Sequence, residues 1–575
     1  MSLEKDNLVR SEPTQRVRIV AITHAPRPSP LETKLAARPS SDPVAPEADN
    51  SEVAIKESEE LSLQKALGLH LRGEFAGAEA VYRQLLRRDQ SNPDCHHLLG
   101  LALHQTGRSA EAEAHLRKAT ELLPGAAEFS NSLGAALIAL DRPDEAWGAI
   151  ESALKIEPGL ADAHYNLGYM DHAAGRLREA LGRYKHALDC NPGHVPATIN
   201  WGSILMNQDR PNEAGLMFQR ALQHEPGSLP ALKSLARVYR AKGSLEASVG
   251  LLQQAIDIEP DNAEAHSELA STFLAIGDFK RGFREYEWRA RRSSAQQRSF
   301  SQDAWNGDSF EAKTLLLHGN QEPAEAIQFV RYASLAAAKG GKVIIECTPT
   351  LKRLFETVPG VVDVCAIGDA LPEFDLHAPM EALPRLFGTT PATIPSDIPY
   401  LSAPAGQALP FQPATGSKLQ IGIVWHCDEP STELGARSFP LSYLLELSAQ
   451  PGISLISLQI GANVEELKQL EAHRIAHIGD RLGDYADTAA AISKLDIVLS
   501  IDSAEAHLAG ALGKPAWLLL GTGMDWRWPE GSKGSPWYPT MRVFRQDQPG
   551  DWDSVYRMLP RAIAAGPGEP TKPAQ

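Results

Sequence analysis

The sequence predicts an α-helical solenoid followed by a pair of doubly wound, Rossmann-like α/β halves. Two observations lead to this prediction. Prolines recur every 34 residues, at Pro124, Pro158, Pro192, Pro226 and Pro260. After about residue 304 the pattern changes to short apolar runs separated by helical stretches, which is typical of parallel sheets covered by helices. The 575 residues are enough to build large cores in both regions.

Composition narrows the class of protein. The formal net charge of −16 argues against general nucleic-acid binding, which needs a basic surface. Five scattered cysteines form no disulfide or zinc pattern and fit a reducing compartment. The N-terminus lacks a secretory signal, and no apolar run approaches the length of a membrane span. We therefore expect a cytoplasmic protein. Residues 1–58 are rich in Pro, Ser, Glu and Ala, so we predict a disordered tail, with a second short tail at 566–575.

The helical region, residues 59–292, fits about seven repeats of 34 residues. Small residues recur at Gly100, Gly134, Gly168 and Gly202, and large ones at Leu116, Ile150, Tyr184 and Phe218. Small residues let two helices approach closely, a large side chain fills the remaining gap, and proline ends the second helix. This is the tetratricopeptide pattern, which predicts a superhelix with a groove for a protein or peptide.

Two asparagines, Asn166 and Asn200, occupy the same position in successive repeats. Because an amide both donates and accepts hydrogen bonds, such a row can hold an extended peptide backbone. The alternative is that these are solvated groove residues without a ligand. The last repeat, residues 277–289, ends in aromatic and basic residues instead of proline, so we expect it to contact the following domain.

The α/β region divides into a first half at 304–401, a Pro/Gly/Ala-rich linker at 402–417 and a second half at 418–565. The predicted strands are the apolar runs at 314–318, 342–347, 361–367, 420–426, 453–460, 496–502 and 516–521. In such folds ligands bind at the carboxyl ends of the strands. Polar residues lie there, among them Gln321, His426 with Trp425, Gln459, and Asp502 with Ser503.

The stretch 497–515 combines a buried strand, a polar turn and a helix start. A helix N-terminus offers free backbone N–H groups and a partial positive charge, which suit a phosphate. Ser503 can cap this end, and His507 lies one turn further on the same face. The alternative is an ordinary strand–helix joint with a satisfied histidine.

Several segments together resemble one family, the bacterial tetratricopeptide proteins with a C-terminal glycosyltransferase domain. That family is similar to the heptosyltransferase-type family and, more distantly, to protein O-GlcNAc transferases. The matching segments run in order along the chain and include 277–289, 305–307, 315–321, 327–332, 394–401, 437–438, 457–459, 484–488, 495–515, 525–528, 535–539 and 544–546.

This resemblance implies a GT-B fold, with the nucleotide-sugar in the second half and the acceptor in the first half or the repeat groove. It implies no metal ion and no cofactor. Glu325 corresponds to the general base of relatives, and Arg437 and His507 are the other candidate catalytic residues, stabilising the diphosphate leaving group. The candidate donor-binding residues are Gln321, Trp425, Ser438, Gln459, Asp487, Thr488, Asp502, Ser503 and His507.

Two loops depart from the family pattern. After the first strand the family has a glycine-rich loop ending in Asp, whereas this chain reads Gly-Asn-Gln-Glu-Pro-Ala-Glu over 319–325. Most polar residues between Trp425 and Arg437 are also replaced. We therefore keep two hypotheses: a glycosyltransferase acting on a protein held by the repeats, and a non-catalytic scaffold with a degenerate transferase domain. The aromatic block around Trp526, Trp528, Trp537 and Tyr538 either lines the ligand cleft or forms a buried lock between the halves.

Overall fold

The computed structural model describes residues 62–208, 210–291, 300–319, 322–406, 419–426, 438–523, 525–529 and 531–566. The predicted N-terminal tail, Gln321, Arg437 and most of the 402–417 linker lie outside these residues. The chain forms two compact units, described separately below. The first comprises Met1–Ile204 with Met217–Pro226, and the second comprises Leu205–Leu216 with Gly227–Gln575.

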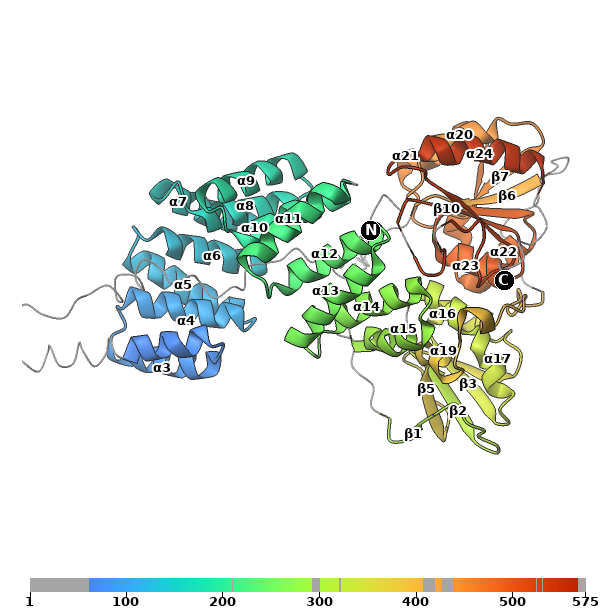
Figure 1. Ribbon diagram of the computed structural model, residues 1–575, viewed down its shortest axis with the longest axis horizontal. Helices are drawn as coiled ribbons and strands as arrows, with labels where there is room; N and C mark the ends of the chain where they lie inside the picture. The colour runs from blue at the N-terminus through green and yellow to red at the C-terminus, as the bar shows by residue number, and fades with distance from the viewer. Residues whose placement is uncertain are drawn as a thin grey trace, which may run out of the picture. The chain divides into compact units, whose positions relative to one another are not determined.

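The first unit is built from consecutive helix pairs (Figure 1). Residues 62–71 are helical. The following helices are α3 (Phe75–Arg88), α4 (Pro93–Gln105), α5 (Ser109–Leu122), α6 (Ala127–Ala139), α7 (Pro143–Ile156), α8 (Ala161–Ala173) and α9 (Leu177–Cys190). Helices α10 (Val195–Asn207) and α11 (Pro211–His224) contribute residues to both units.

Close packing within each pair explains the recurring glycines. A Cβ atom added to Gly134 in α6 would lie 2.4 Å from Cγ1 of Ile150 in α7. One repeat later, a Cβ on Gly168 would lie 2.7 Å from the Tyr184 ring. Since real Cβ atoms do not approach other carbons so closely, only glycine permits this helix separation. The small-and-large pattern of the sequence is thus a pattern of direct contacts.

The second unit begins with four helices of the repeat region. They are α12 (Leu229–Ala241), α13 (Leu245–Ile258), α14 (Ala263–Ile276) and α15 (Phe279–Tyr286). Helix α15 contacts the α/β region, as expected for the last repeat. The Phe279 ring stacks 6.2 Å from Trp537, and the Phe283 ring meets Trp526 edge-on at 5.9 Å.

The first sheet has five parallel strands in the order β1-β5-β2-β3-β4. These are β1 (Asp303–Ala304), β2 (Thr314–His318), β3 (Lys342–Cys347), β4 (Val361–Ala366) and β5 (Leu376–Pro379). Its helices are α16 (Pro323–Phe329), α17 (Arg331–Ala337), α18 (Lys352–Phe355) and α19 (Leu383–Leu386).

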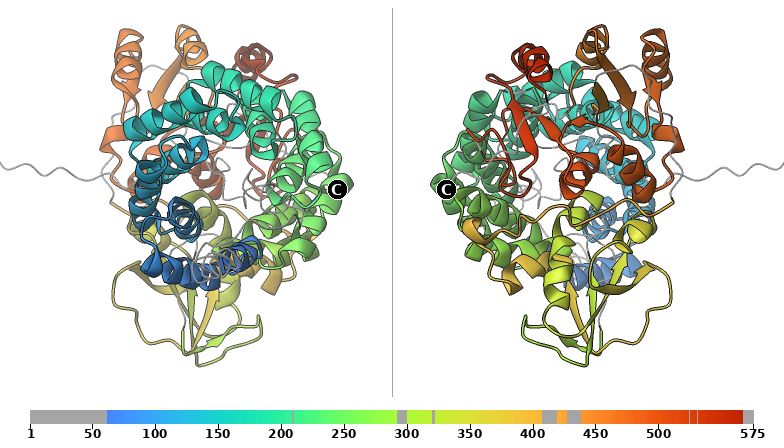
Figure 2. Two further views of the ribbon diagram at one scale, coloured as in Figure 1. Left: turned by 90° about the vertical axis from the view of Figure 1, so that its left-hand side faces the viewer. Right: turned by 90° about the vertical axis from the view of Figure 1, so that its right-hand side faces the viewer.

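The second sheet has six parallel strands in the order β11-β10-β9-β6-β7-β8. These are β6 (Leu419–Val424), β7 (Ile453–Ser457), β8 (Ala476–His477), β9 (Ile497–Ser500), β10 (Ala516–Leu520) and β11 (Met541–Arg545). Its helices are α20 (Leu441–Ser448), α21 (Val464–Ala472), α22 (Tyr485–Ser493), α23 (Ala504–Ala511) and α24 (Trp552–Ala564). Helices α20 and α24 cover one face, and α22 and α23 cover the other (Figures 1 and 2).

One hydrophobic cluster extends through the second unit, from Ala270 in α14 to Ile563 in α24. It therefore joins the last repeat and both sheets into one packed body. Among the described helices, none combines the length and the hydropathy needed to cross a bilayer.

The glycine contacts generate a stability prediction. Gly134→Ala should lower the free energy of unfolding by about 1–3 kcal/mol, because the new methyl group would overlap Ile150. Gly148→Ala is the matched control: it lies inside α7 with nothing within 4 Å of the added Cβ, and should raise stability by about 0.5–1 kcal/mol. Denaturant unfolding followed by circular dichroism measures both, and equal destabilisation would contradict the packing argument.

Candidate functional site

The second sheet has the strand order of a dinucleotide-binding fold. Read from β8 to β11, its strands follow the sequence order 3-2-1-4-5-6. In open parallel sheets of this order, ligands bind beyond the carboxyl ends of the two strands where the order reverses, here β6 and β9. The residues that follow these strands are Trp425 with His426, and Ile501 with Asp502 and Ser503.

The turn after β9 starts helix α23 in the predicted way. Ser503 is the N-cap residue, and its hydroxyl accepts a hydrogen bond from the Ala506 N–H at 3.3 Å. The hydroxyl of Ser500 lies 2.9 Å from that of Ser503, which fixes the turn to the end of the strand. Asp502 is half-buried beside it.

The first turn of α23 also contains an acidic residue that sequence reasoning did not single out. The carboxylate of Glu505 is hydrogen-bonded by the Ser503 hydroxyl and by its own backbone N–H, and burial raises its pKa. The residue is only 9% exposed. A carboxylate at this position interacts favourably with the partial positive charge of the helix N-terminus. The chain thus places a buried carboxyl group, whose charged form burial disfavours, at the helix end that the sequence predicts for a phosphate.

Gln459 forms hydrogen bonds with the backbone of the two residues that follow β6, Trp425 and His426. Its side-chain oxygen accepts hydrogen bonds from the backbone N–H groups of Trp425 and His426, at 3.0 and 3.1 Å. Its side-chain NH₂ group donates to the carbonyl oxygens of His426 and Ile460, both at 2.9 Å. The indole N–H of Trp425 donates to Glu466 in α21 at 2.9 Å. Sequence reasoning assigned the polar groups of Gln459 and Trp425 to the nucleotide-sugar. In the structure they form hydrogen bonds within the protein at the end of β6.

At α22, the structure adds a contact between the two halves. The N-cap residue is Asp484, and Asp487 lies in the first turn, where it accepts from the Gly483 N–H at 2.9 Å. The guanidinium of Arg353 in α18 lies 3.0 Å from Asp484 and 3.5 Å from Asp487. Thr488 is buried and donates to the Asp484 carbonyl at 3.1 Å.

Glu325, the candidate base, is the centre of a buried charge cluster. Its carboxylate accepts hydrogen bonds from the Tyr286 hydroxyl at 2.6 Å and from Arg527 at 3.1 Å. Arg289 lies 2.9 Å from the same oxygen. Glu325 is 8% exposed, and Arg527 is held from its other side by Asp525 at 3.3 Å and by Gln328 at 2.7 Å. Three segments of the chain thus meet at one carboxylate: α15 with its extension, α16 and the 525–528 block.

His507 lies close to this cluster but is uncharged. Its Nδ1 atom shares a hydrogen bond of 2.8 Å with the Tyr538 hydroxyl, and its Nε2 atom is 3.7 Å from Asp502. Burial, reinforced by the nearby positive charge of Arg527, lowers the pKa of His507 to about 3. At neutral pH this histidine can donate one hydrogen bond to a ligand oxygen, but it cannot act as a cation.

The aromatic block forms a buried lock, one of the two predicted possibilities. Trp526, Trp528, Trp537 and Tyr538 are all at most 5% exposed. Arg331 at the start of α17 donates to the Trp537 carbonyl at 2.8 Å, so the block is tied to the first half. The same guanidinium donates to the Tyr400 hydroxyl and to the Pro395 carbonyl, both at 2.9 Å.

In the repeats, the two asparagines proposed for peptide binding form contacts within the helices. Asn166 donates to the side-chain oxygen of Asn131 at 2.9 Å. Asn200 is 1% exposed and donates to the hydroxyls of Tyr165 and Tyr184, at 3.2 and 3.5 Å. In this arrangement both amides link neighbouring helices, so peptide binding by them stays a prediction.

The structure gives little information on the last two predicted site residues, Ser438 and Arg437. Ser438 is half-buried directly after the undescribed 427–437 segment, which contains Arg437. Within the described ranges, no three His, Cys, Asp or Glu side chains are grouped as they would be around a metal ion.

Sequence reasoning missed Tyr286, Arg353, Arg527 and Glu505. Of these, Glu505 had a local signal, an acid in the first turn of an otherwise small and apolar helix.

Comparisons with known proteins identify the repeats. Residues 71–127 match the family described as "Tetratricopeptide repeat", and residues 236–277 match the family described as "TPR repeat". The chain contains tetratricopeptide repeats. A stretch of 328 residues is 24% identical to protein FlbA of Caulobacter vibrioides, which makes FlbA a distant homologue. The match covers 50% of this chain and 53% of FlbA, about half the length of that relative.

Solved structures similar to this chain include PilF of Pseudomonas aeruginosa, with 19% identity over 37% of this chain and 96% of PilF (TM-score 0.31). PilW, a type IV pilus biogenesis factor, has 20% identity over 37% of this chain and 98% of PilW (TM-score 0.32). YrrB, a TPR protein with an unusual peptide-binding site, has 24% identity over 32% of this chain and 95% of YrrB (TM-score 0.24).

The charge cluster generates a prediction on folding. Glu325→Ala should lower the free energy of unfolding of the second unit by about 3 kcal/mol, because it leaves two buried or half-buried arginines without this carboxylate. The control is Glu356→Ala, an exposed acid in the same half, which should change stability by about 0.5 kcal/mol or less. Denaturant unfolding followed by tryptophan fluorescence reports on the aromatic block beside the cluster. Indistinguishable curves for the two variants would show that Glu325 does not hold these segments together.

Proposed function

We propose that this chain is a metal-independent glycosyltransferase that moves a sugar from a nucleotide-activated donor to a protein selected by its TPR repeats. The observation that supports this best is the strand order 3-2-1-4-5-6 of the second sheet, with the capped helix α23 beginning at the β6/β9 reversal. Two parallel α/β halves packed against each other match the GT-B fold that the sequence resemblance implies. The TPR repeats themselves imply protein partners.

In this proposal the diphosphate of the donor binds near Asp502, Ser503 and His507, with Arg437 as the cation. The neutral His507 donates a hydrogen bond to the leaving group as negative charge develops there. Glu325 is the general base for the acceptor. Gln459 and Trp425 hold the end of β6 in the shape that the nucleotide requires.

A second candidate function is a non-catalytic scaffold whose TPR repeats bind a protein partner. Two observations favour it. The Glu325 carboxylate is buried and already bound by Tyr286, Arg289 and Arg527, which leaves it poorly placed to take a proton from an acceptor. In addition, the buried carboxyl group of Glu505 already occupies the first turn of α23, where the proposed diphosphate would bind. Both features suit a fold that keeps its architecture without turnover.

Donor hydrolysis by the purified full-length chain distinguishes these functions. With a panel of UDP-, GDP-, CMP- and dTDP-sugars, the transferase should hydrolyse one donor slowly without acceptor, and His507→Ala should reduce this rate by about 100-fold. His473→Ala, an exposed histidine on the same half, is the control and should leave the rate unchanged. Nucleotide binding without turnover of any donor would support the scaffold and overturn the transferase.

The acid in α23 generates a separate binding prediction. Glu505→Gln keeps the side-chain shape but cannot ionise near the proposed diphosphate site. At pH values where burial no longer keeps the Glu505 carboxyl neutral, the variant should therefore bind UDP or GDP about tenfold more tightly than the wild type. Calorimetric titration measures this affinity. Glu471→Gln, which removes an exposed charge near the end of α21, should have no effect. An unchanged affinity in Glu505→Gln would mean that the diphosphate does not approach α23.

A further inference from the structure

Four charged residues form a closed ion-pair square at two successive junctions between repeats in the first unit. At the first junction Arg83 and Arg108 each pair with both Glu79 and Glu111, at 2.8, 3.5, 2.8 and 2.7 Å. The second junction repeats this square 34 residues later. It consists of Glu113, Arg117, Arg142 and Glu145, with distances of 2.7, 3.6, 2.6 and 2.7 Å. Each square contains two glutamates and two arginines, so its formal charge is zero.

The third junction breaks the square. The equivalent four positions hold Trp147, Glu151, Arg176 and Glu179, so one acid is replaced by tryptophan and one arginine by glutamate. Arg176 turns to Asp171 at 2.8 Å, and the Trp147 indole N–H donates to Glu151 at 2.9 Å. Within the described part of the chain, the Glu179 side chain forms neither a hydrogen bond nor an ion pair.

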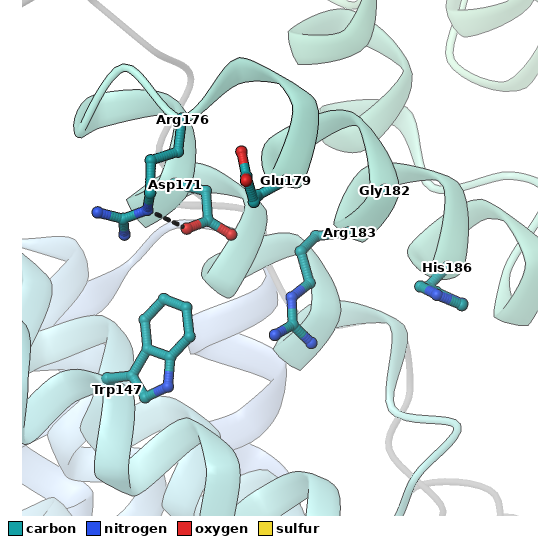
Figure 3. A pocket seen from close by; sticks show the side chains of 7 residues that line it. All are labelled: Trp147, Asp171, Arg176, Glu179, Gly182, Arg183 and His186. Carbon is teal, nitrogen blue, oxygen red and sulfur yellow. Dashed lines mark hydrogen bonds and ion pairs between the residues drawn. The ribbon is translucent and has the colours of Figure 1, made fainter.

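A pocket of about 430 Å³ opens where the square is broken. It is lined by Trp147, Asp171, Arg176, Glu179, Gly182, Arg183 and His186. Figure 3 shows Trp147 and Arg183 pointing toward the same space, with Asp171 and Glu179 beyond it. A Cβ atom added at Gly182 would meet nothing within 4 Å, so this wall of the pocket is open. The pocket thus combines an indole face with a free carboxylate.

The charged side chains around this pocket carry one more negative charge than positive charge. Asp171, Glu151 and Glu179 contribute three negative charges, and Arg176 and Arg183 contribute two positive ones. The guanidinium carbon of Arg183 lies 5.8 Å from the ring centre of Trp147, and Arg183 makes no ion pair with Glu179 among the described residues. The two complete squares show what is missing: a basic side chain at the position of Arg83 and Arg117. The whole chain, at −16, also favours a basic partner.

We propose that this pocket binds an arginine side chain from a basic segment of a protein partner. The partner's guanidinium stacks on the Trp147 indole and pairs with Glu179, and so completes the third square from outside the chain. Arginine suits this site because its planar guanidinium can stack on an aromatic face and still present paired N–H donors to a carboxylate. The site lies between α7, α8 and α9 and is independent of the nucleotide chemistry proposed for the second unit.

The indole N–H resonance of Trp147 tests this directly. In the full-length chain labelled with ¹⁵N-tryptophan, this resonance is assigned by its absence in Trp147→Phe. N-acetylarginine amide should shift it saturably, whereas N-acetylcitrulline amide, the neutral isostere, should not. Glu179→Gln should weaken binding of the arginine probe about threefold, the range of one partly exposed ion pair. Glu145→Gln, the equivalent position in the complete second square, should leave the affinity unchanged.

Four results would overturn the proposal. Equal shifts with citrulline would show that charge is not recognised, and a saturable shift with N-acetylglutamate amide in its place would assign the pocket to an anion held by Arg176 and Arg183. An equal loss of affinity in Glu145→Gln would mean that the broken square has no special role. The absence of any saturable shift, with both glutamine variants melting at the wild-type temperature, would mean that the pocket takes no basic side chain.

Discussion

The carboxylate of Glu325 is the point at which the last repeat and both α/β halves are joined. Its partners come from the α15 helix, from the turn that follows it and from the 525–528 block, and all of them are close to or inside the core. A buried charge is tolerated only when its partners are in place, because desolvation otherwise outweighs the remaining interactions. The three segments must therefore assemble together. This explains why the last repeat helices belong to the same compact unit as the sheets.

Further arginines restrict movement between the two halves. Arg331 reaches from α17 to the Trp537 carbonyl, and Arg353 reaches from α18 to Asp484 at the start of α22. A hinge opening between the halves would break both contacts and separate the aromatic block from α15. In the proposed function, the ligand therefore reaches the carboxyl ends of the strands without a wide opening of the halves. In that proposal, Gln459 and Glu505, which already form hydrogen bonds within the protein at those strand ends, limit ligand binding as much as the predicted donor-binding residues support it.

The sequence predicts the parts of this fold that depend on local periodicity. The repeats follow from residues 34 positions apart, and the longer strands follow from continuous apolar runs. Strand β5 is missed because it is four residues long and includes Pro379, and β11 is missed because its apolar residues alternate with Arg542 and Arg545. The cap by Ser503 is predictable because a cap is a local interaction. The contact of Arg527 with Gln328 is not, because it joins positions 199 residues apart whose proximity depends on both sheets being complete.

The same reasoning explains why function is best sought where a repeat departs from its own pattern. The glycine positions recur because each holds two helices at one distance, and the ion-pair squares recur where two successive repeats meet. At the third junction, packing is unchanged: Gly168 still receives the Tyr184 ring. Only the charged positions differ from those of the first two junctions. The two replaced residues contact each other, because the Trp147 indole N–H donates a hydrogen bond to Glu151, and Arg176 pairs with Asp171 instead. A loss of helix packing would disturb the apolar positions as well. The substitutions at this junction instead place an indole and a carboxylate without a side-chain partner among the described residues at the edge of a pocket. This is a chemical change that the packing of the repeat does not require.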